Sequence, residues 1–425
     1  MKNKYTFLFA FALLLFSFTE TSAQCNGLRY RDFTFGQDSV VSNVVYGSNL
    51  SYSNATTSLK LDIYFPAGDT ATSRPLIIMA HGGNFLGGSK TGGDVLQLCH
   101  DLCKMGYVVA SIDYRVGMTN FPFPGPDSTD ATESVMRAVH DGRAAVRFFR
   151  KDFANGNTYG IDTSNIYFAG VSAGGFIGLH IAYLDEPSEF PSWADTTGQY
   201  GLHGGIEGLS GNPGYSSNVR GVINICGALG DTAWIHPGDE PACLLHGDQD
   251  NTVPYGSAVI VLLGSYPLLG VDGSHSIAAR LNEDGIENCF ETYEGQDHIP
   301  HVGNAAYYDT TLNVMRNFLV HFVCGDPLNC AYNNPISVNE LPQLSPLVNI
   351  YPNPAGESVT IDLSRLAKPA NTIELVDYMG RVIAQQAPSG ASRTEINTGN
   401  LAPGIYLIRI TGEDFMYTSS IVVAH

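Results

Sequence analysis

The stretch that decides the fold is Asn165-Ile166-Tyr167-Phe168-Ala169-Gly170-Val171-Ser172-Ala173-Gly174-Gly175. Its first half is rich in apolar, β-branched and aromatic residues, which predicts a buried strand. Residues 175–184 then place apolar side chains at helical spacing and predict a helix. A Gly-x-Ser-x-Gly sequence between a strand and a helix is typical of a nucleophile elbow, in which the serine occupies a strained turn. Ser172 is therefore the candidate nucleophile; the alternative is a glycine-rich turn that merely contains a serine.

Strands and helices alternate on both sides of this motif, from residue 59 to residue 323. Apolar runs predict strands at 61–65, 75–80, 107–112, 221–226, 242–246 and 289–293. Amphipathic patterns predict helices at 94–105, 128–153 and 307–323. This alternation predicts an α/β fold, with a doubly wound, mostly parallel sheet covered by helices on both faces.

A nucleophilic serine needs a base and an acid that orients the base. The order serine, acid, histidine is the one used when the serine follows a strand in this way. Leu245-His246-Gly247-Asp248-Gln249-Asp250 follows a predicted strand, and a Val-Pro turn comes shortly after Asp250. That turn would hold the backbone at Asp250, which makes it the preferred acid. Asp248 is the alternative, expected instead to accept hydrogen bonds within its own loop.

The candidate base lies in the loop after the next strand. Tyr293-Glu294-Gly295-Gln296-Asp297-His298 leaves the strand and opens a loop. His298 is the preferred base because of this position, and His301 is the alternative.

An oxyanion hole is expected next to the strand at 75–80. His81-Gly82-Gly83-Asn84 follows that strand directly, where related sequences carry a His-Gly-Gly-Gly motif. Asn84 replaces the third glycine, and asparagine tolerates unusual backbone angles. The backbone N–H groups of Gly83 or Asn84 and of Ala173 are the expected oxyanion donors, whereas His81 is expected to hold its own loop.

The composition excludes several partners. The 425 residues include 22 Lys and Arg against 41 Asp and Glu, a net charge of −19. This acidic balance argues against binding to nucleic acid or to anionic membranes.

The N-terminus reads as a signal peptide over residues 1–23. Lys2 and Lys4 precede an apolar run at 7–18, and small residues end at Ala23. The run is short for a membrane span, and Gln24-Cys25 lacks the small residue that a lipoprotein site has before its cysteine. We therefore expect export without a membrane anchor.

All eight cysteines lie after residue 23, and an even number in an exported chain permits disulfides. Cys324 and Cys330 are the candidate pair, because they could close a short loop. Cys226 and Cys243 lie in apolar runs and are expected to be buried thiols. No Cys-x-x-Cys pair occurs, and Cys99 and Cys103 lack nearby histidines at zinc-finger spacing, so no metal site is expected. No organic cofactor is expected either.

The remaining segments divide the chain into domains. Residues 24–323 are expected to form the catalytic domain. Within it, the Gly- and Pro-rich insertion 186–218 is expected to roof the site, with Trp193 binding substrate. Residues 324–347 read as a linker, and the short alternating runs of 348–425 predict a small β-sandwich.

Together, residues 59–323 resemble the α/β-hydrolase fold, specifically its carboxylesterase and feruloyl-esterase-like members. The motifs that carry the resemblance are Leu61-Asp62-Ile63-Tyr64, His81-Gly82-Gly83, Asp113-Tyr114-Arg115, Gly170-x-Ser172-x-Gly174 and the loops of Asp250 and His298. The resemblance implies ester hydrolysis through an acyl-enzyme, on substrates that include plant-wall acetyl or feruloyl esters.

Two other functions stay open at this point. The same triad cleaves peptides in prolyl-type peptidases, which usually carry a large gating domain ahead of the hydrolase; here only residues 24–58 are available. A surface-binding protein with an inactive hydrolase fold is the other alternative.

The tail has a resemblance of its own. Ile350-Tyr351-Pro352-Asn353-Pro354, residues 376–381 and Leu401-Ala402-Pro403-Gly404-Ile405-Tyr406 are similar to the type IX secretion sorting domain of Bacteroidota. The resemblance implies passage through the periplasm, recognition by the secretion machinery, and a final place at the cell surface or in the medium. A carbohydrate-binding β-sandwich is the alternative.

Overall fold

The computed structural model describes residues 25, 27–190, 193, 200–331, 348–366, 369–377, 381–388, 392–412 and 416–424. The predicted signal peptide and most of the predicted linker lie outside these residues. The chain forms two compact units, residues 1–334 and residues 335–425.

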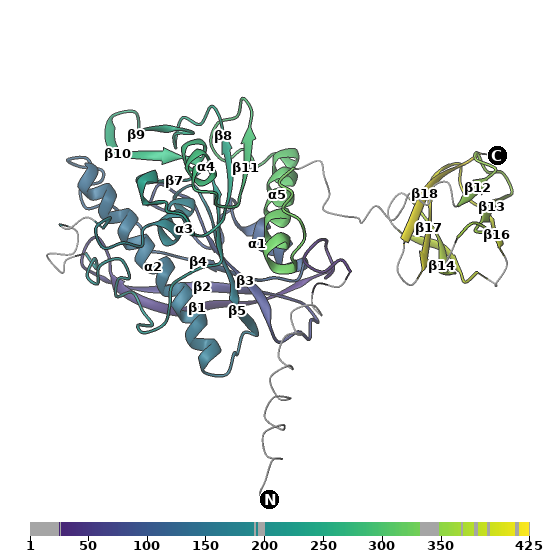
Figure 1. Ribbon diagram of the computed structural model, residues 1–425, viewed down its shortest axis with the longest axis horizontal. Coiled ribbons are helices and arrows are strands. Elements are labelled where there is room, and N and C mark those ends of the chain that lie inside the picture. The colour runs from purple at the N-terminus through teal and green to yellow at the C-terminus, as the bar shows by residue number, and fades with distance from the viewer. Residues whose placement is uncertain are drawn as a thin grey trace, which may run out of the picture. The chain divides into compact units, whose positions relative to one another are not determined.

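An eight-stranded sheet forms the centre of the first unit (Figure 1), with the strand order β1-β2-β4-β3-β5-β6-β8-β11. Strand β2 is antiparallel to both of its neighbours, and the strands from β4 to β11 are parallel. The predicted, mostly parallel sheet is therefore confirmed. The strands are β1 (Asp38–Leu50), β2 (Thr56–Pro66), β3 (Arg74–Ala80), β4 (Val108–Ile112), β5 (Ile161–Val171), β6 (Gly221–Ile225), β8 (Ala242–Gly247) and β11 (Asn288–Tyr293).

Helices cover both faces of this sheet, as the parallel strands require (Figure 1). Helices α1 and α5 contact each other on one face, whereas α2, α3 and α4 pack on the other. Every residue of β3, β4, β6 and β8 is buried, as expected of strands covered on both faces. The helices are α1 (Leu96–Lys104), α2 (Ser128–Ala154), α3 (Ala173–Tyr183), α4 (Ser274–Glu283) and α5 (Ala305–Cys324).

Local signals set the ends of the two longest helices. The Asp127 carboxylate accepts the N–H groups of Thr129 and Asp130, and the Asp127 N–H donates to the Asp130 carboxylate, which completes a capping box at the start of α2. The Asn304 side chain caps α5 by accepting the N–H groups of Ala306 and Tyr307. Gly325, with φ 75°, ends that helix in the left-handed conformation.

A second, smaller sheet lies beside the N-terminal part of α2 (Figure 1). It has the order β7-β10-β9, and β9 and β10 form a hairpin. This hairpin, residues 257–273, is not among the elements expected from the sequence. The strands are β7 (Ala228–Leu229), β9 (Ser257–Leu262) and β10 (Tyr266–Gly273).

A buried ion pair fixes α2 to the sheet. The Arg115 side chain, just after β4, pairs with Asp141 of α2 at 2.8 Å, with side chains 1% and 0% exposed. The backbone N–H of Arg115 also donates to Asp141 at 2.8 Å, and the Ser210 hydroxyl donates to it at 2.6 Å. Because both charges are hydrogen-bonded as well as paired, their burial is compensated.

The disulfides correct one expectation. The bonds join Cys25 to Cys324 and Cys289 to Cys330, so the predicted Cys324–Cys330 pair is wrong. Helix α5 brings Cys324 to the N-terminal segment, where Arg31 pairs with Asp326 at 2.7 Å. The chain beyond α5 then returns to the start of β11. Tertiary packing, not the short spacing, decides the pairing.

The buried thiols agree with the sequence. Cys226 and Cys243 are free and buried, as predicted, and so are Cys99 and Cys103. Among the described residues, no helix is long and apolar enough to cross a bilayer.

The second unit is all-β, as predicted. It contains two antiparallel sheets, β12-β13-β16 and β15-β14-β17-β18. Alternate apolar residues of these strands form a shared core, which includes Val359, Ile373 and Ile408. The strands are β12 (Asn349–Tyr351), β13 (Ser358–Asp362), β14 (Ala370–Val376), β15 (Val382–Gln386), β16 (Arg393–Asn397), β17 (Gly404–Gly412) and β18 (Met416–Val423).

Candidate active site

Ser172 is the single residue between β5 and α3. Its backbone has φ 53° and ψ −117°, a conformation that costs free energy for any residue with a Cβ. The glycines around it are required by close packing. A Cβ at Gly170 would lie 2.1 Å from backbone atoms of Gly174, and a Cβ at Gly174 would lie 2.0 Å from the carbonyl oxygen of Ala80. The Gly-x-Ser-x-Gly motif therefore holds the serine in its strained turn.

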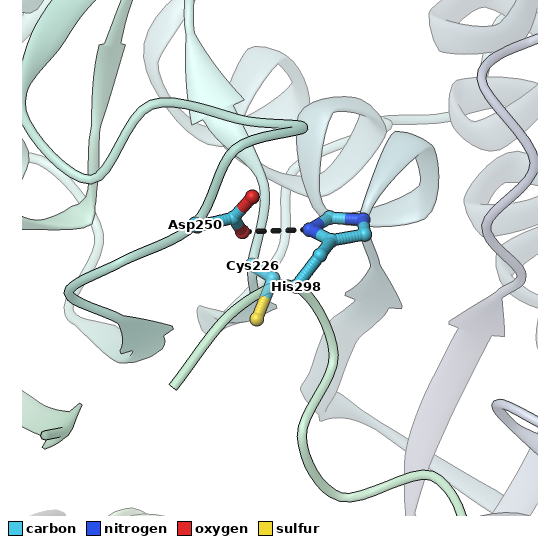
Figure 2. Close-up of side chains that lie close together, drawn as sticks. All are labelled: Cys226, Asp250 and His298. Carbon is cyan, nitrogen blue, oxygen red and sulfur yellow. Dashed lines mark hydrogen bonds and ion pairs between the residues drawn. The ribbon is translucent and has the colours of Figure 1, made fainter. Parts of the chain in front are cut away.

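His298 connects Ser172 to Asp250. Its Nε2 lies 2.9 Å from Ser172 Oγ, and its Nδ1 lies 2.6 Å from Asp250 Oδ2 (Figure 2). Because a carboxylate only accepts hydrogen bonds, Nδ1 carries the proton and Nε2 is free to accept from the serine hydroxyl. Ser172, His298 and Asp250 thus lie within hydrogen-bond reach of one another, the arrangement that a nucleophile, a base and an orienting acid require.

The Asp250 carboxylate has a donor for each of its four lone-pair positions. Oδ1 accepts the backbone N–H groups of Thr252 and Val253, both at 2.8 Å. Oδ2 faces His298 and His246, at 2.6 and 3.2 Å. Burial alone would raise the pKa of Asp250, but the hydrogen bonds from His246 and His298 outweigh it and hold that pKa below its ordinary value. The acid therefore stays ionised.

The two alternative residues have other partners. Asp248 accepts the backbone N–H of Gly295 at 2.7 Å, within the loop region. His301 donates from Nε2 to the carbonyl of Asp94 at 3.1 Å, and its burial lowers its pKa. The structure thus brings Asp250 and His298 to Ser172, and it leaves Asp248 and His301 in supporting positions.

Contacts with Tyr114 and Asp94 hold the loop after β3 in place. The Tyr114 hydroxyl donates to the His81 carbonyl at 2.8 Å, and the two rings stack with centroids 4.3 Å apart. The Gly82 N–H donates to Asp94 Oδ2 at 2.7 Å. His81 is buried, which lowers its pKa, and its Nδ1 hydrogen-bonds the Gly82 carbonyl. His81 therefore holds its own loop.

The same loop presents free backbone donors. Gly83, Asn84 and Phe85 have φ values of 123°, 55° and 58°. Asparagine tolerates this left-handed region, whereas phenylalanine rarely enters it. Within the described part of the chain, the N–H groups of Gly83, Asn84 and Ala173 have no protein acceptor. They are available to an oxyanion formed beside Ser172.

Two cavities meet at Ser172. The first has a volume of about 50 Å³ and apolar walls, which include Phe85, Val135, Phe176 and Leu268. The second has a volume of about 410 Å³ and opens to solvent between the Gly83 loop, Asp94, Thr252 and His298. One side of the serine is therefore narrow and apolar, and the other is wide and partly polar.

The roof over the apolar cavity is the β9–β10 hairpin. Its inward residues Ile260, Leu262, Leu268 and Leu269 line that cavity. None of the described residues of 186–218 lines either cavity, and the role of this insertion as a roof stays a prediction.

The insertion is held elsewhere. His140 of α2 donates to the Gly205 carbonyl at 2.7 Å, and Arg147 donates to the Glu207 carbonyl at 2.9 Å. These contacts fix the described part of 186–218 on α2. Trp193 is 45% exposed and lines neither of these two cavities, so its role in binding substrate stays a prediction. The continuous apolar, partly β-branched run at 258–263 is the sequence signal that could have predicted strand β9.

Two family models match the chain. Residues 61–229 match the BD-FAE model, an esterase-type α/β-hydrolase family. Residues 349–424 match the secretion system C-terminal sorting domain. The first unit thus contains a segment that matches an esterase-type α/β-hydrolase family, and the second unit matches a secretion sorting domain. The sorting domain indicates export to the cell surface or the medium.

Similarity to individual proteins is low. The chain is 30% identical over 126 residues to the neuroligin-like protein glit-1 of Caenorhabditis elegans, which is 29% of this chain and 16% of that protein. It is 30% identical over 131 residues to the non-reducing polyketide synthase atr1 of Stereocaulon alpinum, 31% of this chain and 5% of that protein. The chain thus matches less than a fifth of the length of either curated relative.

Solved esterases are among the structures to which this chain is similar. The propionate-bound esterase 2 of Thermogutta terrifontis is 22% identical, with a TM-score of 0.48 over 66% of this chain and 94% of that chain. A truncated carbohydrate esterase from gut microbiota is 21% identical, with a TM-score of 0.45 over 68% and 98% of the two chains.

One group of potential metal ligands occurs in the described part of this hydrolase. The ligand atoms of Cys226, Asp250 and His298 lie within 4.8 Å of one another (Figure 2). Burial raises the pKa of the Cys226 thiol to about 12, so it stays protonated and is a poor ligand. His298 Nδ1 already binds Asp250. The chemistry of this group fits a proton-transfer pair better than a metal centre.

We expect the hairpin, not the insertion, to set acyl-chain preference. Leu268→Ala removes apolar atoms from the cavity wall and should raise kcat/KM for hexanoyl relative to acetyl p-nitrophenyl esters about tenfold. Trp193→Ala is the control and should leave this ratio unchanged. A changed ratio in Trp193→Ala together with an unchanged ratio in Leu268→Ala would place the insertion over the site instead.

Proposed function

We propose that this secreted esterase hydrolyses carboxylic esters through an acyl-enzyme on Ser172, with His298 as general base and Asp250 as the acid that orients it. The observation that carries the proposal is the continuous hydrogen-bond chain Ser172–His298–Asp250, with distances of 2.9 and 2.6 Å. The ionised acid fixes the histidine tautomer that accepts the serine proton.

The first half of the reaction forms a bond to the serine. Ser172 Oγ attacks the ester carbonyl carbon while His298 Nε2 takes the hydroxyl proton. The carbonyl oxygen becomes an oxyanion, which the N–H groups of Ala173 and of Gly83 or Asn84 stabilise. The intermediate then collapses: the bond to the alcohol oxygen breaks, and His298 gives its proton to the leaving alcohol.

The second half releases the acid. Water gives a proton to His298 and attacks the acyl-enzyme carbonyl, and the same backbone donors hold the second oxyanion. The second intermediate then collapses: the bond from the acyl carbon to Ser172 Oγ breaks, His298 gives its proton to Oγ, and the carboxylic acid leaves. Throughout, Asp250 remains a carboxylate and stabilises the imidazolium form of His298.

The shapes of the two cavities support a small acyl group and a larger alcohol. The apolar cavity of about 50 Å³ has room for an acetyl or similarly short chain but is too small for a feruloyl group. The open cavity of about 410 Å³ suits a bulky, polar alcohol. Among plant-wall esters, we therefore favour acetyl esters over feruloyl esters as substrates.

We expect substitutions in the triad to be severe. Ser172→Ala and His298→Ala should each lower kcat for p-nitrophenyl acetate by on the order of 10⁴-fold or more, because members of a triad act as a unit. Asp250→Asn should be comparable, since it presents the wrong hydrogen-bond partner to His298.

Asp248→Asn is the matched control, at a position two residues before Asp250 in the same loop. It keeps an oxygen that can accept the Gly295 N–H and should retain kcat within a few-fold. Near-normal kcat in His298→Ala, with inactive His301→Ala, would assign the base to His301.

We expect the tail to direct export and to contribute nothing to ester hydrolysis. A chain that ends after Asn334 keeps all four disulfide cysteines and every triad residue, so it should retain full activity on soluble esters. In the native host it should accumulate in the periplasm. Normal export of the shortened chain would contradict the sorting role, and a loss confined to insoluble polysaccharide would indicate a binding module.

A further inference from the structure

A second histidine faces the acid of the proposed triad. His246 lies near the end of β8, and its side chain is fully buried. Its Nε2 lies 3.1 Å from the Val253 carbonyl oxygen and 3.2 Å from Asp250 Oδ2. Because both neighbours only accept hydrogen bonds, Nε2 carries the ring proton and donates toward them.

The other ring nitrogen of His246 is held by a further chain of donors. Ser274 Oγ lies 2.8 Å from His246 Nδ1, and Asn224 Nδ2 donates to Ser274 Oγ at 3.0 Å. With the proton on Nε2, Nδ1 of the neutral ring accepts, so the serine hydroxyl donates to it. The bonds therefore run in one direction, from Asn224 through Ser274 to His246, whose Nε2–H faces both the Val253 carbonyl oxygen and Asp250 Oδ2. Asn224, Ser274 and His246 are all 0% exposed.

The far end of this chain is fixed against the nucleophile helix. The Gly227 N–H donates to Asn224 Oδ1 at 3.0 Å, and Asn224 Nδ2 also lies 3.3 Å from the Gly227 carbonyl. A Cβ at Gly175 would lie 2.1 Å from Asn224 Oδ1. The asparagine amide is thus wedged beside the start of α3, three residues after Ser172.

The middle of the chain is fixed as tightly. Ser274 is the first residue of α4, directly after β10. A Cβ at Gly273 would lie 1.8 Å from the Pro254 carbonyl oxygen, and the His275 N–H donates to the Tyr255 carbonyl at 3.0 Å. The segment that follows Asp250 therefore packs on the junction that carries Ser274.

We propose that His246, with its tautomer set by Ser274 and Asn224, is a positioning residue that fixes Asp250 Oδ2 toward His298. This inference rests on the proposed triad. Oδ1 alone is held by backbone N–H groups, so without His246 the carboxylate can tilt about its Cβ–Cγ bond and carry the imidazole of His298 away from Ser172. A shift of about 1 Å at a reacting group costs on the order of 10²-fold in rate.

A buried histidine with several hydrogen bonds also stabilises the fold, so the test must separate the two roles. His246→Phe keeps an aromatic ring but removes both nitrogens. His246→Gln restores a donor near the Nε2 position. His140→Phe is the matched control: His140 is also fully buried and donates to a backbone carbonyl, but it lies on α2 beside the insertion.

Each variant is compared by kcat and KM for p-nitrophenyl acetate, per active site titrated with a serine-reactive phosphonate, and by its melting temperature. We expect His246→Phe to lose about 10²-fold in kcat with KM within threefold of wild type. His246→Gln should recover most of that loss. His140→Phe should lose melting temperature while keeping wild-type kcat per titrated site.

A smaller change keeps the inference testable if His246→Phe does not fold. Ser274→Ala removes only the proton donor to His246 Nδ1 and should lower kcat about tenfold. Ser276→Ala, two residues further along α4, is its control. If His246→Phe folds and keeps wild-type kcat per titrated site, the positioning role is wrong. If His246→Phe does not fold, wild-type kcat per site in Ser274→Ala leads to the same conclusion. An inactive wild-type protein would instead overturn the proposed function itself.

Discussion

The backbone at Ser172 is the constraint on which the rest of the first unit depends. A residue with a side chain stays at φ 53° only if its surroundings leave no other conformation. Here the glycines on either side let β5, α3 and the end of β3 approach to distances that exclude a Cβ. The central parallel strands and the nucleophile helix therefore have to meet at this point, and the carboxyl ends of β8 and β11 bring the acid and the base to the same edge.

Electrostatics then determines what the serine can do. The Asp250 carboxylate is buried, yet four donors surround it, so the charge is compensated and its direction is set. Two of those donors are histidines with opposite tasks. His298 connects the acid to Ser172, and His246 connects it to the interior through Ser274 and Asn224. The polar network thus extends from Ser172 to Asn224, which packs beside the start of α3.

Much of this architecture was predictable because it depends on local patterns. Continuous apolar strands, amphipathic helices and the Gly-x-Ser-x-Gly turn are encoded over short windows, and so the α/β class and the order of the elements follow from the sequence. The loops of Asp250 and His298 were recognisable for the same reason: each comes directly after a strand. That the two side chains meet Ser172 depends on parallel strands ending at one edge of the sheet.

The features that the sequence did not predict depend on tertiary packing. Cys324 and Cys330 are close in sequence, but α5 sends them to different partners, Cys25 and Cys289. The β9–β10 hairpin, which lines the apolar cavity, was not expected, because no chemical motif marks it. The insertion 186–218 contacts α2 through Gly205 and Glu207, and its role as a roof stays a prediction. His246 lies in the loop sequence that predicts the acid, next to Asp248 and Asp250. Its contact with Asp250 Oδ2 could not be predicted, because it depends on the folded structure.

The identity of the nucleophile is the central claim, and covalent labelling tests it most directly. The intact protein is treated with a serine-reactive phosphonate until esterase activity is lost, then digested and mapped by mass spectrometry. If Ser172 is the nucleophile, we expect one phosphonyl group per chain, on the peptide that contains Ser172, and no label on Ser172→Ala. Loss of activity with the label on a different residue, or full activity after Ser172 is labelled, would contradict it.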